Sequence, residues 1–260
     1  MKHRAILGLT VLALLLANPA ATRAATEDAH AILKAAFDYW RGTTSRTEIV
    51  MTVHRPSWER RSVMSSWTRG QKDALVRFLE PAKDAGSATL KLGDDMWIYT
   101  PKLDRVLKLP YSMMAQSWMG SDFSYSDLAK SDALLVHYDL SLKGTEQQDG
   151  HTVYLIDATP KPNAPVIWGK QTVSVRDDHL LLKEIFYDQD LVMVKKLTAT
   201  QIGPLGGKKV YVTKMRMEKS EKPGNWTELE YKSAKFDLEL PSSLFTVGNL
   251  RNPRSQWEKH

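Results

Sequence analysis

The side chains that best suggest a chemical role are apolar and polarisable, with few candidates for nucleophilic or acid–base work. The chain has ten Met and eight Trp. A group of them lies within a short stretch, namely Met96, Trp97, Met113, Met114, Trp118 and Met119. Met is unbranched and polarisable, so it adapts to apolar guests of varied shape, such as a flexible acyl chain. Two interpretations stand at this point: the group lines a hydrophobic pocket, or it fills an ordinary core.

A pocket for an acyl chain needs no polar motif, because burying each methylene contributes about 0.8 kcal/mol. The first interpretation therefore predicts a hydrophobic cavity or lid and no catalytic signature. The predicted ligand-binding residues are Trp97, Tyr99, Met113, Met114, Trp118, Met119 and Phe123.

Catalytic and metal-binding patterns are weak. The chain has no cysteine, which excludes a disulfide, a thiolate nucleophile and any Cys-based metal site. No Gly-x-Ser-x-Gly or Gly-x-Gly-x-x-Gly motif is present, and no two histidines have metal-ligand spacing. The pairs Asp94-Asp95 and Asp177-Asp178 are typical of turns, and Lys195-Lys196 is typical of a solvated strand face. We therefore predict no catalytic residue, metal or cofactor.

The first residues have the layout of a secretory signal peptide. Lys2 and Arg4 precede an uncharged apolar run over 5–17, and small residues end at Ala24. Thirteen residues are short for a membrane span, which needs about 20. We predict a signal peptide over 1–24 and one soluble periplasmic domain over 25–260. Removing three basic residues and no acid lowers the formal charge from +6 to +3, and an exported protein is not expected to bind nucleic acid.

The elements that must position these residues are mostly strands. Residues 27–40 have apolar side chains at spacings of three and four, which predicts one amphipathic helix. The period then changes to two over stretches such as 49–53, 62–68 and 96–100, separated by turn residues. Residues 134–142 are predicted to resume the strands, which continue to 236. This pattern predicts a mainly β fold, a half-closed antiparallel barrel of about eleven strands.

One segment breaks the strand rhythm. Residues 110–132 hold the Met-rich stretch, then Gly120, then a short helical signal from Ser126. We predict an irregular, partly helical insertion that crosses the sheet as a lid. The N-terminal helix would cover one opening of the barrel.

Several motifs also resemble a known family. They are residues 67–70 (WTRG), 78–87 (FLEPAKDAGS), 96–101 (MWIYTP) and 119–128 (MGSDFSYSDL). This block resembles the outer-membrane lipoprotein-sorting proteins, a group similar to the LolA/LolB lipoprotein carriers. The resemblance implies an unclosed antiparallel barrel with a helical lid over a hydrophobic cavity.

Three functions remain open. The first is periplasmic carriage of lipoprotein acyl chains or phospholipid towards the outer membrane, with a lipid or lipidated protein, an inner-membrane transporter or an outer-membrane acceptor as partners. The second is a non-transporting interaction or sensor module, accessory to an exporter. The third is an enzyme, which would need polar groups that converge only in the fold.

Overall fold

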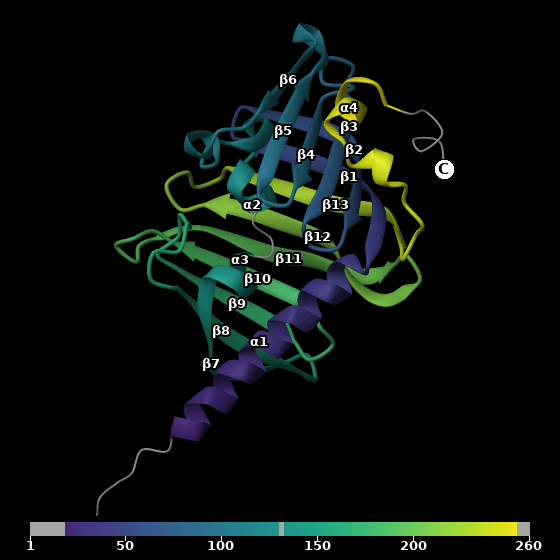
Figure 1. Cartoon of the computed structure of the whole chain (residues 1–260). Coiled ribbons are helices and arrows are strands. Elements are labelled where there is room, and N and C mark those ends of the chain that lie inside the picture. The colour runs from purple at the N-terminus through teal and green to yellow at the C-terminus, as the bar shows by residue number, and fades with distance from the viewer. Residues whose placement is uncertain (1–18, 130–132, 254–260) are drawn as a thin grey trace, which may run out of the picture.

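The protein is built on one large antiparallel sheet. A computed structural model describes residues 19–129 and 133–253. The strands follow the order β6-β5-β4-β3-β2-β1-β13-β12-β11-β10-β9-β8-β7. The sheet is curved and open, which confirms the predicted half-closed barrel, although it has thirteen strands where about eleven were expected (Figure 1).

Two runs of sequential strands form the two wings of this sheet. The first wing comprises β1 (Thr44–Arg55), β2 (Trp58–Arg69), β3 (Asp73–Glu80), β4 (Ala88–Leu92), β5 (Asp95–Thr100) and β6 (Arg105–Lys108). The second comprises β7 (Tyr138–Gln148), β8 (His151–Pro160), β9 (Lys170–Arg176), β10 (Leu181–Tyr187), β11 (Met193–Leu205), β12 (Lys208–Lys219) and β13 (Trp226–Phe236).

The first and last strands join the wings. β1 pairs with β13 from Ser45 opposite Phe236 to His54 opposite Trp226. Short turns connect most neighbours within each wing, as antiparallel strands allow, whereas residues 161–169 link β8 to β9 and residues 81–87 link β3 to β4. The free edges are therefore β6 and β7, and the chain must cross from one to the other.

Helix α1 (Pro19–Arg41) lies along the second wing (Figure 1). It contains the predicted helix over 27–40. Ala29, Leu33 and Ala36 recur on one side of it and are at most 2% exposed. They pack in one cluster with Leu140, Ile156 and other apolar residues of β7 to β10 and β12. The face of the sheet that α1 covers is called the inner face below.

The insertion carries the chain from β6 to β7 and comprises residues 109–137. It contains short turns of 3-10 helix, η2 (Tyr111–Met113) and η3 (Trp118–Gly120), followed by α2 (Tyr125–Ala129) and α3 (Ala133–His137). This confirms the predicted irregular, partly helical segment, of which residues 130–132 lie outside the described residues.

The strand predicted from residue 134 begins later. Residues 134–137 belong to α3, and β7 starts at Tyr138. Ala133 and Leu134 are buried, and α3 contacts α1. A short apolar run fits a buried helical turn as well as a strand, and packing against α1 decides between them here.

The outer face of the first wing is covered by the C-terminal segment. This segment follows β13 and contains η4 (Ser242–Leu244) and α4 (Val247–Arg251). The short turn η1 (Pro101–Leu103) lies elsewhere, between β5 and β6. Leu244, Phe245 and Leu250 pack with Trp67, Leu75, Ala88 and Leu90. The Arg77 guanidinium, from β3, donates to the carbonyl oxygens of Asn249 and Leu250 at 2.8 and 3.2 Å. It thereby satisfies acceptors at the end of α4, which has no next turn to bond them.

Candidate functional site

A cavity of about 210 Å³ lies between α1, the insertion and the inner face of the second wing. Apolar side chains from each of these parts form most of its wall. They are Ala36, Phe37 and Trp40 from α1, Phe123, Leu128, Ala133 and Leu134 from the insertion, and Leu181, Phe186, Leu197, Met215, Met217 and Leu229 from the strands. Such a wall suits an apolar guest, because it offers contact area with few competing hydrogen-bonding groups.

A second cavity of about 150 Å³ adjoins the first on the side of the first wing. Ile49, Met64, Val76, Met96 and Trp118 line it. The two cavities share a wall that consists of Trp40, Arg41, Asp127, Leu128, Leu229 and Tyr231. The two cavities together are called the hollow below, and it extends under the insertion across both wings.

The structure brings only some of the predicted ligand-binding residues to this hollow. Phe123 lines the first cavity and Trp118 lines the second. Met119 packs against the same apolar cluster as these two. Met113 and Met114 pack beneath β5 and β6 with Met96 and Leu109, outside the walls of both cavities.

Trp97 and Tyr99 lie on the other side of the sheet. Along β5, side chains alternate between faces. Met96 lines the second cavity, whereas Trp97 and Tyr99 pack with Leu244 and Phe245 on the outer face. Trp97 and Tyr99 were predicted to line the cavity because they are aromatic. The alternation along β5 instead turns their neighbour Met96 towards the inner face. A ligand-binding role for the predicted set as a whole stays a prediction.

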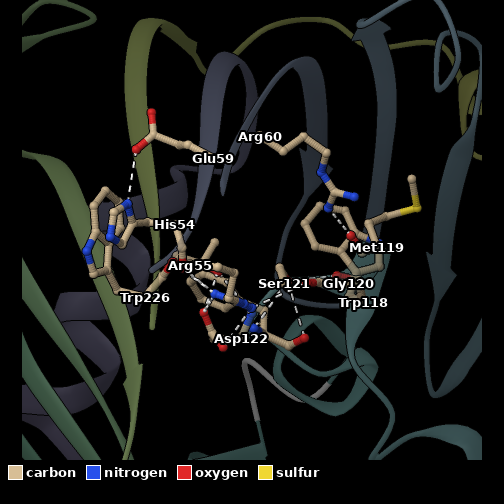
Figure 2. Close-up of polar contacts among 12 residues, drawn as sticks. His54, Arg55, Glu59, Arg60, Trp118, Met119, Gly120, Ser121, Asp122 and Trp226 are labelled. Carbon is tan, nitrogen blue, oxygen red and sulfur yellow. Dashed lines mark hydrogen bonds and ion pairs between the residues drawn. The ribbon is translucent and has the colours of Figure 1, made fainter. Parts of the chain in front are cut away.

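The insertion is fastened to the β1–β2 hairpin by a buried ion pair (Figure 2). The Arg55 guanidinium donates to both carboxylate oxygens of Asp122, at 2.9 and 3.1 Å. The Asp122 side chain is 2% exposed, and its carboxylate also accepts from the Thr227 hydroxyl at 2.7 Å. These bonds compensate the desolvation of the carboxylate, which burial alone would make costly.

Neighbouring residues add to the same attachment (Figure 2). Arg60 donates to the carbonyl oxygen of Met119. Gly120 has a φ of +68°, a conformation that glycine adopts without strain. The indole N–H of Trp118 donates to the Thr89 hydroxyl at 3.1 Å and so orients that ring on the inner face. The motif over 119–128 thus positions the insertion over the hollow.

A second buried ion pair holds α2 to β11. The Lys195 ammonium donates to Oδ2 of Asp127 at 2.5 Å, and the two side chains are 3% and 8% exposed. The Asp127 carboxylate also accepts from the backbone N–H of Ser124. The prediction that Lys195 belongs to a solvated strand face is therefore wrong. Lys195 shares the inner face with Leu197, and its ammonium lies 4.8 Å from the ring centres of Trp168 and Phe186.

Glu184, on β10, is one of the residues of the first cavity that sequence reasoning missed. Burial, followed by the negative charge of Asp127, raises the pKa of Glu184 from 4.5 to about 8. The sequence held a signal for it. Glu184 and Phe186 share one strand face by alternation, so an acidic residue stands beside a large apolar one. Leu181 joins them on the cavity side because the register shifts between Leu181 and Lys183.

One cluster outside the hollow could in principle hold a metal. Nitrogen and oxygen atoms of His151, Asp177 and Asp178 lie within 4.8 Å of one another. The Asp178 carboxylate binds the Arg176 guanidinium at 2.7 and 2.8 Å, and Asp177 binds the backbone N–H of Thr152. These side chains stabilise the turn after β9, as predicted for the Asp177-Asp178 pair.

Within residues 19–129 and 133–253, no helix is both long enough and apolar enough to span a membrane.

Comparison with solved structures gives the class of fold. A DUF1329 family protein from Desulfovibrio piger matches with a TM-score of 0.78 and 26% identity, covering 87% of this chain and 99% of that one. An outer-membrane lipoprotein-sorting protein domain from Vibrio parahaemolyticus matches at 0.76 and 22%, with coverage of 87% and 99%. A LolA superfamily protein from Nitrosomonas europaea matches at 0.70 and 22%, with coverage of 84% and 97%. The fold is that of LolA-like proteins, as the sequence motifs implied.

A sequence-family model described only as an uncharacterized-protein family matches residues 70–252. The match covers more than half of the chain, and the protein belongs to this family. No curated protein matches this chain.

Proposed function

We propose that the protein binds a hydrophobic ligand in the hollow of the sheet and carries it through the periplasm towards the outer membrane. The cavity under α1 and the insertion supports this proposal most directly, because its wall is largely apolar and it is not filled by the protein's own side chains. A core with no ligand to accommodate would gain free energy by closing such a space, since a cavity forfeits the contacts that its lining atoms could make.

The LolA-like fold supports a proposal for the chemical class of the cargo. We propose that the cargo is the acyl chain of a phospholipid or of a lipidated protein. The partners would then be an inner-membrane transporter that loads the cargo and an outer-membrane acceptor that receives it. In this proposal the protein performs no reaction on its ligand, and the predicted signal peptide directs it to the periplasm.

Mass spectrometry of the intact protein tests the proposal. The full chain would be expressed with its own N-terminal segment, purified from the periplasm and sprayed under native conditions. We expect additional mass that disappears on denaturation and that solvent extraction identifies as lipid. Protein that carries no lipid and fails to bind an acyl probe would contradict carriage and favour an interaction module.

A variant that fills the cavity supplies the matched comparison. Ala36 is 2% exposed and lines the first cavity, so Ala36→Trp should occupy the ligand's space. Ala85 lies in an exposed turn after β3, so Ala85→Trp adds the same side chain away from the hollow. We expect Ala36→Trp to lose the co-purified lipid and Ala85→Trp to retain it.

A further inference from the structure

The first cavity has an acidic pair, Asp127 and Glu184, in a mostly apolar wall that also holds Arg41, Gln71, Ser126 and Gln171. Oδ2 of Asp127 is bonded to Lys195, but its Oδ1 atom is buried and has no hydrogen-bond partner among the described residues. The Asp127 side chain is 8% exposed. Leaving a buried acceptor unsatisfied destabilises the folded protein. This oxygen therefore has an unused acceptor position.

Glu184 presents the complementary group. No hydrogen bond or ion pair joins its carboxyl to any residue that the structure describes, and it lines the first cavity. Burial and the charge of Asp127 keep it protonated at neutral pH, so that it offers an O–H donor. A ligand at the acidic pair thus meets one free acceptor and one free donor.

The charges of the surrounding groups narrow the choice of ligand. A carboxylate or phosphate would lie beside the negative charge of Asp127, and the Lys195 ammonium is already bonded to that carboxylate and placed over two rings. Arg41, a cation that lines the first cavity, donates to the carbonyl oxygen of Gln71. An ammonium would have to be desolvated in a mostly apolar cavity, which is unfavourable. A hydroxyl group both donates and accepts, and carries no charge.

We infer that the ligand of the first cavity is an amphiphile whose polar end is an uncharged hydroxyl, bound at Asp127 and Glu184 with its alkyl or acyl chain along the apolar wall. This inference rests on the proposed function and names the ligand class within it. A lipid alcohol and the free hydroxyl of an acylglycerol share this chemistry.

Three probes with the same chain and different polar ends test the inference. Dodecanol, dodecanoate and dodecylamine would be titrated into the delipidated full-length protein at about pH 6, where Glu184 is protonated. Trp40 and Trp168 line the cavity, so their fluorescence reports occupancy, and calorimetry gives the affinity. We expect dodecanol to bind at least about tenfold more tightly than the other two, which corresponds to about 1.4 kcal/mol. Monododecanoylglycerol, measured alongside, separates an acylglycerol from a simple alcohol as the source of the hydroxyl.

Variants assign the preference to the acidic pair. Glu184→Leu removes the polar group and leaves the Asp127–Lys195 bond intact, so dodecanol should bind about tenfold more weakly while the preference over dodecylamine falls. Glu184→Gln keeps a donor and an acceptor and should retain most of the affinity. Glu146→Leu, on the exposed end of β7, is the matched control and should change nothing.

The possible outcomes distinguish failure of the hydroxyl assignment from failure of the proposed ligand-binding function. Equal binding of the three probes, unchanged by Glu184→Leu, would overturn the hydroxyl assignment and leave apolar binding intact. Tightest binding of dodecanoate or of dodecylamine would also overturn it, in favour of an anionic or a cationic polar end. Failure of every probe to bind would overturn both proposals.

Discussion

The Arg55–Asp122 ion pair is a buried attachment of the insertion, and it gives a direct prediction. Asp122→Ala leaves the Arg55 charge, 15% exposed, without its carboxylate. We expect the free energy of unfolding to fall by about 3–5 kcal/mol, the usual cost of breaking a buried pair from one side. Urea unfolding monitored by circular dichroism measures this change.

The Lys108–Asp95 pair is the control, because its side chains are 56% and 51% exposed. Solvent screens such a pair, so Asp95→Ala should cost less than about 1 kcal/mol. Equal losses in the two variants would mean that the insertion is held by apolar packing and not by its buried charges.

Glu184 predicts an unusual dependence of stability on pH. Its pKa rises from 4.5 to about 8 on folding, so the folded state binds a proton that the unfolded state releases between these values. The contribution of Glu184 to stability is therefore complete below about pH 4.5 and is lost progressively as pH rises to about 8. A shift of this size corresponds to a few kcal/mol.

Comparison with Glu184→Gln isolates this effect, since glutamine does not titrate. The difference in unfolding free energy between the native protein and Glu184→Gln should change in favour of the variant between about pH 5 and pH 8. A constant difference across this range would show that the carboxyl is ionised in the folded protein, and would also remove the donor that the hydroxyl ligand requires.

At the scale of elements, periodicity decided what could be predicted. The helix over 27–40 and most strands follow from spacings of three to four and of two, because α1 and the strands each bury one face. The strand expected from residue 134 was wrong because the short apolar run over 133–136 does not distinguish a helical turn from a strand. Packing of α3 against α1 decides there, and that contact joins segments about a hundred residues apart.

The faces of the strands were harder to assign than the strands. Alternation in β5 separates Met96 from Trp97, but it does not say which set faces the hollow. That depends on the C-terminal segment, which covers Trp97 and Tyr99. For β10 the order of residues did carry information, because Glu184 interrupts an apolar face. Its partner Asp127 could not be found in this way, since it lies in the insertion and reaches β11 only through the fold.

At the scale of the whole molecule, the hollow depends on parts that the sheet alone does not connect. Among the strands that the structure describes, the wings pair only through β1 and β13, and α1 and the insertion cover the inner face between them. The outer layer of α4 packs on the opposite side. A ligand in the first cavity touches α1, the insertion and the second wing, and should therefore stabilise these parts together, while the outer layer has no contact with it.

Hydrogen exchange with and without dodecanol measures this coupling. A ligand at about a hundred times its dissociation constant adds about 2.7 kcal/mol to any opening that releases it. Exchange should therefore slow by up to about a hundredfold in the last turns of α1, in α2 and in β10, where openings expose the cavity. Amides of α4 should exchange at an unchanged rate.

Equal protection of α4 and α1 would mean that the protein opens only as one unit. Protection confined to α4 and β5 would instead place the ligand near Trp97 and Tyr99, on the outer face.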